Sequence, residues 1–71
     1  MKAKNTIIGV VNCLRLHIHS EPNLESEVVC KERYLTELVV DLADSTKEFY
    51  RVYTVSGIVG FCQKHLVTIK Q

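Results

Sequence analysis

Two histidines at alternate positions, His17 and His19, are spaced like half of a metal site. Side chains alternate across a strand, so both imidazoles would share one face of an extended segment. Imidazole is a good ligand for zinc or nickel, but Cys62 and His65 would complete the site only if the fold brought them near. The alternative is a solvated polar face opposite an apolar one made by Leu14, Leu16 and Ile18. We favour this alternative and predict no metal and no cofactor.

Three cysteines, Cys13, Cys30 and Cys62, form an odd set without C-x-x-C spacing, whereas secreted disulfide frameworks normally use an even number. We predict three reduced thiols that act as small apolar fillers, with one disulfide plus a free thiol left open. A cysteine nucleophile would need an adjacent imidazole and a third orienting group. Nothing in the sequence couples such groups, and G-x-S-x-G and H-E-x-x-H motifs are absent. We therefore predict a protein that is not an enzyme.

The composition is that of one soluble globular domain over residues 1–71, with 46% hydrophobic and 24% charged residues. The net charge is +1 and the nine Lys and Arg are scattered, so we expect no nucleic-acid partner. No apolar run approaches the roughly 20 residues that span a membrane. Residues 1–4 look faintly like the start of a signal peptide, but the apolar run after them is too short. We expect a cytoplasmic or virion protein if the chain is complete, and an extracellular cell-wall module if it is excised from a longer one.

Short strands separated by turns account for most of the chain. The alternating run ending at His19 predicts a strand that Pro22 terminates, because proline lacks the N–H that a ladder needs. Ser56-Gly57 predicts a hairpin turn. We place the other strands near residues 6–11, 28–29, 38–40, 50–55, 58–62 and 66–69, and allow a single 3₁₀ turn within residues 62–66. Residues 31–37 are too short and too poorly patterned for a helix. An all-β fold follows, and at this length a small β-barrel of five to seven strands.

A family resemblance connects these segments. The stretch from Leu16 to Pro22 resembles the L-N-V-R-S-G-P motif that opens bacterial SH3 domains (SH3b, SH3 type 3). Phe49-Tyr50-Arg51-Val52 resembles the family's W-Y-K-V strand, residues 57–62 resemble G-K-x-G-W-V, and His65-Leu66 stands where the family often has Y-L. The match runs in order from about residue 10 to residue 69. It implies an SH3-like β-barrel whose core includes Leu16, Ile18, Val52 and Phe61.

The strongest binding candidates lie between residues 49 and 53. Alternation places Tyr50 and Val52 on one face and Phe49, Arg51 and Tyr53 on the other. The resemblance implies that the Val52 face is core, so we predict Phe49 and Tyr53 at or near the surface beside Arg51, with Tyr34 as a fourth candidate. Aromatic residues and arginine are enriched at recognition hot spots. The open alternative is that Phe49 or Tyr53 caps an end of the barrel.

Two function classes follow. The resemblance implies a module that binds a short peptide, such as the stem or cross-bridge peptide of bacterial peptidoglycan, within a parent hydrolase if the chain is an excised piece. The alternative is an intracellular or phage-virion module that docks on a larger protein assembly. The initial Met1, the missing export signal and the thiols favour the second class. The family's common use in cell-wall hydrolases favours the first. Neither class involves a membrane or nucleic acid.

Overall fold

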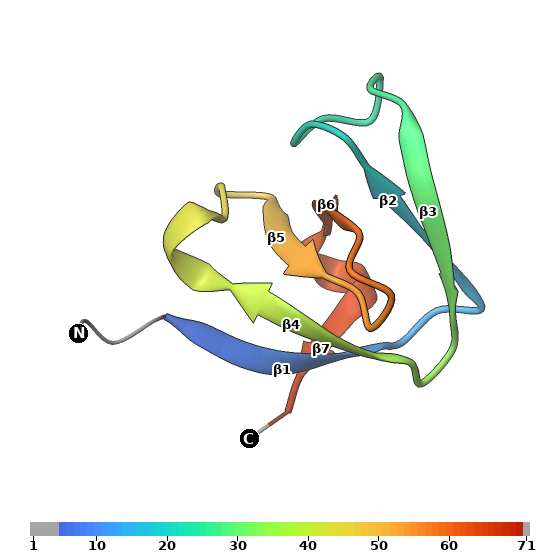
Figure 1. The fold of residues 1–71 in the computed structure, drawn as a ribbon, viewed down its shortest axis with the longest axis vertical. Coiled ribbons are helices and arrows are strands. Elements are labelled where there is room, and N and C mark those ends of the chain that lie inside the picture. Colours follow the sequence, from blue (N-terminus) through green and yellow to red (C-terminus); the bar gives the residue numbers. More distant parts are fainter. Residues whose placement is uncertain (1–4, 71) are drawn as a thin grey trace.

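A computed structural model describes residues 5–70, and the signal-like residues 1–4 lie outside them. Seven strands form one antiparallel sheet, so the all-β prediction is confirmed (Figure 1). Two 3₁₀ turns, η1 and η2, interrupt the strands. The elements are β1 (Thr6–Val11), β2 (Arg15–His19), β3 (Val28–Arg33), β4 (Glu37–Asp41), η1 (Leu42–Asp44), β5 (Phe49–Tyr53), β6 (Val59–Gln63), η2 (Lys64–Leu66) and β7 (Val67–Ile69).

Only one of the two 3₁₀ turns was predicted from the sequence. η2 falls inside the segment where a single turn was expected, whereas η1 was not expected. Asp41 explains η1, because its side chain accepts a hydrogen bond from the backbone N–H of Ala43 at 3.1 Å. The N–H of Ser45 then bonds the carbonyl of Leu42 and closes the turn. Gly57, with φ of +92°, occupies the predicted tight turn between β5 and β6.

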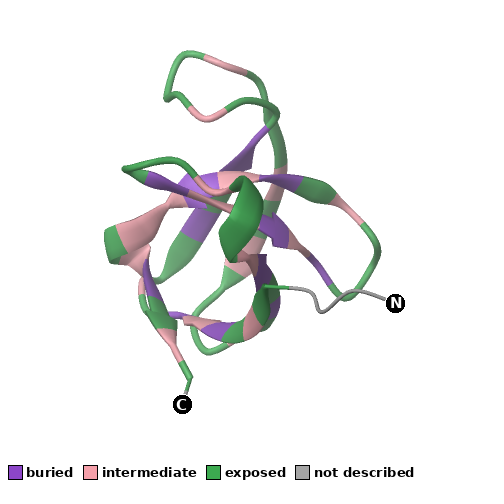
Figure 2. Ribbon diagram, turned by 90° about the vertical axis from the view of Figure 1, so that its left-hand side faces the viewer, coloured by how far each residue is buried: buried purple, intermediate pink, exposed green. Residues whose placement is uncertain are grey.

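The sheet is open between its two end strands. The strand order is β3-β2-β6-β5-β4-β1-β7, and no pairing within residues 5–70 joins β3 to β7. The expected closure into a barrel is therefore not present. β2 meets β6 at one residue pair, His19 with Phe61, so the β2–β3 hairpin stands away from the other strands (Figures 1 and 2). A Cβ at Gly60 would lie 2.5 Å from Ile18 and 2.7 Å from the carbonyl of His19, so only glycine permits this contact.

One hydrophobic core unites the strands despite the open sheet. Leu16, Ile18 and Val52 are fully buried, as predicted. Phe61 was also predicted to be core, and this is wrong: it is half-buried on the outer face. The register pairs Val52 with Gly60, so Gly60 and Cys62 face the core. Phe61, which lies between them in the strand, therefore faces the other side of the sheet. The core consists of Val11, Leu16, Ile18, Leu38, Val40, Val52, Cys62 and Val67.

The two histidines share one face, as predicted, with ring centroids 6.5 Å apart, but this face is not wholly solvated. His17 is exposed, but His19 is only 6% exposed. The register shift between Ile18 and His19 leaves Val29 of β3 as the extra residue, so the alternation along β2 is kept. A ring nitrogen of His19, Nδ1, lies 3.1 Å from the carbonyl of Ser26. Leu14 precedes β2 and is 87% exposed, so it does not contribute to the apolar face.

The resemblance placed both Leu16 and Phe61 in the core, but truncating them should lower the free energy of unfolding by different amounts. We expect Leu16→Ala to lower the free energy of unfolding by about 2–5 kcal/mol, because a fully buried leucine leaves a cavity. Phe61→Ala should cost less than Leu16→Ala, since part of that ring already contacts water. Urea unfolding of both variants measures the difference. An equal or larger loss for Phe61→Ala would contradict the outward placement of this ring.

Candidate functional site

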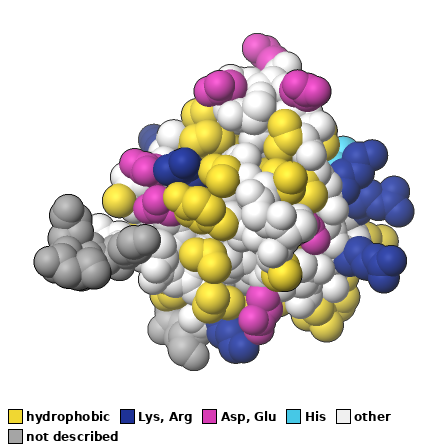
Figure 3. All heavy atoms as spheres, in the orientation of Figure 1, with side chains coloured by type: hydrophobic (Ala, Val, Ile, Leu, Met, Phe, Trp, Pro, Cys, Tyr) yellow, Lys and Arg dark blue, Asp and Glu magenta, His cyan; other side chains and the backbone are white. Residues whose placement is uncertain are grey.

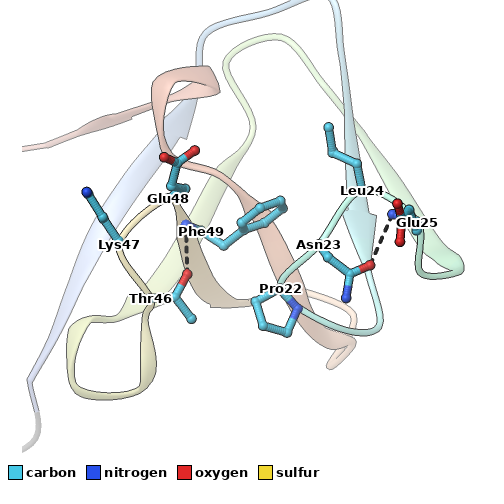
Figure 4. A pocket seen from close by; sticks show the side chains of 8 residues that line it. All are labelled: Pro22, Asn23, Leu24, Glu25, Thr46, Lys47, Glu48 and Phe49. Atoms are coloured by element: carbon cyan, nitrogen blue, oxygen red, sulfur yellow. Dashed lines mark hydrogen bonds between the residues drawn. The ribbon is translucent and has the colours of Figure 1, made fainter.

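An open cleft of about 440 Å³ lies between two loops that are distant in the sequence (Figure 4). One wall comes from the loop between β2 and β3, and the other from the segment that leads into β5. The ring of Phe49 lies between the walls and points toward the β2–β3 loop. Charged side chains from both walls stand beside this apolar base. The lining residues are Pro22, Asn23, Leu24, Glu25, Thr46, Lys47, Glu48 and Phe49.

The first wall is shaped by local hydrogen bonds around Pro22, where the strand pairing of β2 stops. The Asn23 side chain accepts a hydrogen bond from the N–H of Glu25 at 3.0 Å, which makes a tight turn. The hydroxyl of Ser26 donates to the carbonyl of Asn23 at 2.8 Å. These bonds hold the loop in a defined shape and leave Leu24 59% exposed on the cleft wall.

The second wall is a four-residue turn from Thr46 to Phe49. The N–H of Thr46 donates to the carbonyl of Phe49 at 2.8 Å, and the N–H of Phe49 donates to the hydroxyl of Thr46 at 3.1 Å. The N–H of Lys64 donates to the carbonyl of Glu48 at 3.0 Å, which fastens the turn to η2. Each wall is therefore held in shape by its own hydrogen bonds.

The predicted surface position of Phe49 is not what the structure shows. Its side chain is buried, with 8% of the residue exposed, at the base of the cleft. Alternation alone places Phe49 on the same side of β5 as Arg51 and Tyr53, but the β2–β3 loop covers that end of the strand. A ligand in the cleft would reach the edge of this ring and not its full face.

Arg51 and Tyr53 do lie together, as predicted, on the outer side of β5. The guanidinium carbon of Arg51 is 5.4 Å from the centre of the Tyr53 ring, within the range of a cation–π contact. Arg51 is also engaged with two acids that the sequence did not link to it. Its Nη1 donates to Asp44 at 2.7 Å and lies 3.7 Å from Asp41. Neither Arg51 nor Tyr53 lines the cleft.

Tyr34, the fourth candidate, lies elsewhere. It follows β3 at the turn into β4 and is 55% exposed. The cleft wall precedes β3, so the six residues of this strand, about 20 Å long, separate Tyr34 from the cleft. The structure thus brings two of the four predicted residues into contact, places Phe49 beneath a neighbouring cleft and leaves Tyr34 apart.

The residues that sequence reasoning missed are those of the two cleft walls. Pro22 was recognised as the end of a strand and residues 44–48 as a polar turn, but nothing in the sequence places these segments opposite one another. Their meeting depends on the pairing of β2 with β6 and of β6 with β5. A cluster of turn-forming residues beside an exposed leucine, Leu24, was the available local signal.

All three cysteines are free thiols, as predicted. Burial, with a smaller contribution from Cys13, raises the pKa of the Cys62 thiol to about 12. Burial and a hydrogen bond to Glu32 also raise the pKa of Cys30. Both groups therefore stay protonated at neutral pH, and a thiol is a far weaker nucleophile than a thiolate. Within residues 5–70, no three His, Cys, Asp or Glu side chains gather in a way that could hold a metal ion.

Thiol titration should follow this burial. In native protein near pH 8, we expect Cys62 to remain unmodified by a disulfide reagent such as DTNB, because its sulfur is buried and protonated. After denaturation under non-reducing conditions, all three thiols should react. Mass spectrometry of the labelled peptides identifies each site. Rapid labelling of Cys62 in the native state would contradict its placement in the core.

Comparison with protein-family models, curated proteins and solved structures finds no match for this chain. Across the part of the chain that the structure describes, no helix is both long and apolar enough to cross a membrane. The function proposed next therefore depends on the cleft, on the residues around it and on the motif resemblance.

Proposed function

We propose that this chain is a non-catalytic, SH3b-like binding module that takes a short peptide in the cleft between the β2–β3 loop and residues 46–49. The observation that carries the proposal is the cleft itself. It combines an apolar base, formed by Phe49 and Pro22, with a neighbouring leucine and with charges of both signs at its edge. Peptide recognition needs this combination, because apolar contacts supply affinity and polar groups fix orientation.

The SH3-like part of the proposal has support from the core and the strand sequence. Six of the seven strands contribute buried side chains to one cluster, so the sheet curls around a common centre although its ends do not pair. A 3₁₀ turn, η2, precedes the short last strand and contains His65-Leu66, the pair that stands where the family often has Y-L. The Pro22 loop, which ends the opening motif, forms a cleft wall.

The chemistry of the cleft suits a peptide of small residues with free charged groups. Lys47 and Glu48 stand on one side and Glu25 on the other, all three exposed. A ligand carboxylate can pair with Lys47, and a ligand amine with either glutamate. The peptides of bacterial peptidoglycan carry such groups beside small apolar side chains, and we propose them as the ligand class.

Arg51 takes a secondary part in this proposal. Both acids that contact it approach the same nitrogen, Nη1. An arginine carries three further N–H donors on Nη2 and Nε. These groups can donate to a ligand carbonyl or carboxylate while Asp44 and Tyr53 hold the guanidinium in place. Phe49 remains our proposed aromatic contact in the cleft, Tyr53 and Arg51 contact only a ligand that extends beyond the cleft along β5, and Tyr34 lies outside this site.

One observation favours the second class, a module that docks on a larger protein assembly in a cell or a virion. Four apolar side chains form a cross-strand row on the outer face of the sheet. The pairs Ile8 with Val39, Val39 with Tyr53, and Tyr53 with Val59 connect four adjacent strands. Ile8, Val39 and Val59 are all exposed. A flat apolar row of this kind suits protein docking better than capture of a small peptide.

Sedimentation with purified bacterial cell walls tests the first class. We expect the wild-type protein to sediment with walls and to bind a soluble stem peptide in an NMR titration. Leu24→Asp should weaken both by about tenfold, or ~1.4 kcal/mol, since it places a charge on the apolar wall. Leu14→Asp is the matched control, because Leu14 is equally apolar, more exposed and outside the cleft.

The same experiment separates the two classes. Wall binding that survives Leu24→Asp would move the site away from the cleft. If the wild type does not sediment with cell walls but associates with a larger protein assembly, and Val39→Glu abolishes that association, the docking module replaces the peptide module.

A further inference from the structure

The outer face of the β2–β3 hairpin carries four basic side chains in two cross-strand pairs. Arg15 lies directly opposite Arg33, and His17 directly opposite Lys31. All four residues are exposed. Figure 3 shows Lys and Arg side chains gathered, next to a His, on the side of the molecule where Figure 1 places β3. The chain as a whole has a net charge of only +1, so this face is locally basic on a nearly neutral protein.

The arrangement is unfavourable for the isolated protein. Directly opposite side chains lie about 5 Å apart at Cβ, and a like-charge pair such as Arg15 with Arg33 destabilises a sheet. Glu32 cannot offset them, because it lies on the other side of β3, opposite Leu16, and accepts a hydrogen bond from Cys30. The ion pairs found among the described residues belong to Arg51 and Lys70. The four basic groups thus face solvent without an acidic partner in residues 5–70.

Protection of an exposed sheet edge does not by itself explain why these basic side chains face one another in cross-strand pairs. Charged residues on an end strand, and lysine above all, discourage pairing with other chains, and β3 is an end strand. Arg15 and His17 lie on β2, which meets β6 only at His19, but edge protection does not require them to lie directly opposite Arg33 and Lys31. Their addition doubles the basic array on one face. This points to recognition of an anionic partner.

We propose that this face binds an extended acidic peptide segment with carboxylates at alternate positions. Alternate residues of a strand are about 7 Å apart, which is the spacing from Arg33 to Lys31 and also from one carboxylate to the next in such a segment. Guanidinium groups bind carboxylates through paired hydrogen bonds, and Arg15 and Arg33 present two of them side by side. As the last strand of the sheet, β3 also offers unpaired backbone groups to an added strand.

Charge on the rest of the hairpin favours a short peptide over nucleic acid. The loop at the other end of the hairpin carries Glu21, Glu25 and Glu27, all exposed, and Figure 3 shows acidic side chains gathered at this tip. A phosphate backbone continuing along the hairpin would meet these carboxylates and be repelled. A peptide of a few residues can occupy the basic half alone. This face is separate from the cleft, so the inference does not depend on the proposed function.

Fluorescence anisotropy with a labelled hexapeptide that alternates Glu and Thr tests the proposal. We expect saturable binding at about 20 mM salt that weakens strongly at about 500 mM, because the contacts are exposed charge pairs. The peptide with Gln in place of Glu should not bind. Arg15→Gln with Arg33→Gln should weaken binding at least about tenfold. The melting temperature of this double variant should stay equal or rise, since a like-charge pair is removed.

Lys64→Gln with Lys70→Gln is the charge-matched control, because it removes two cations away from the hairpin. We expect it to change binding less than about twofold. Equal losses in both double variants would overturn the proposal, since binding would then follow net charge. Tighter binding of a six-nucleotide thymidine oligonucleotide would also overturn it, and so would no binding of the Glu peptide. Self-association of the wild type that Glu25→Gln with Glu27→Gln abolishes would assign the face to a second copy.

Discussion

The close approach of β2 to β6 at Gly60 is the constraint on which the rest of this structure depends. The β2–β3 hairpin is joined to the other strands by one backbone pair and by the buried side chains of Leu16 and Ile18. That contact exists only because position 60 has no Cβ to collide with Ile18 and the backbone of His19. If the two strands moved apart, Ile18 would lose its packing, and the Pro22 loop would no longer face the turn at Thr46. The core and the cleft thus have one common requirement.

Local order on either side of this contact has independent causes. The loop after β2 is held by Asn23 and Ser26, and the turn before β5 by Thr46. Arg51 is fixed by Asp44 from η1 and by the ring of Tyr53. Such short-range bonds form from neighbouring residues. The long-range placement of the two walls comes from burial of apolar surface, which is the larger and less directional contribution.

The fold was predictable from sequence where patterns are local, and it was not where they depend on register. Alternation and turn residues located all seven strands, although β3 was predicted only at residues 28–29 and runs on to Arg33, and Ser56-Gly57 marked the hairpin correctly. Phe61 was misplaced because a family motif does not say which of two neighbouring side chains faces the core. The pairing of Val52 with Gly60 decides this. His19 lies on the predicted face but is buried, because the loop after β2 reaches it through the carbonyl of Ser26, and alternation does not announce that contact. Closure of the sheet depends on end strands that sequence cannot pair.

The candidate site shows the same division. Arg51 and Tyr53 are neighbours on one strand, so alternation was enough to bring them together. Phe49 obeys the same alternation, yet a loop more than twenty positions earlier in the chain covers it. The acids that hold Arg51 belong to β4 and η1, and only the register of β4 with β5 places Asp41 opposite it. Contacts between segments distant in the chain are therefore what the sequence left undetermined.

The single-pair junction between β2 and β6 has a consequence for energetics. The two cleft walls belong to parts of the sheet joined by little backbone hydrogen bonding, so a molecule seated between them acts as a clasp across the junction. Ligand binding then stabilises the packing of the β2–β3 hairpin against the other strands, by an amount that grows with the logarithm of ligand concentration. Amide protons of β2 and β3, whose opening needs no global unfolding, would report that gain before those of β4 and β5. Ligand occupancy of the cleft and the stability of the hairpin's packing are therefore thermodynamically linked.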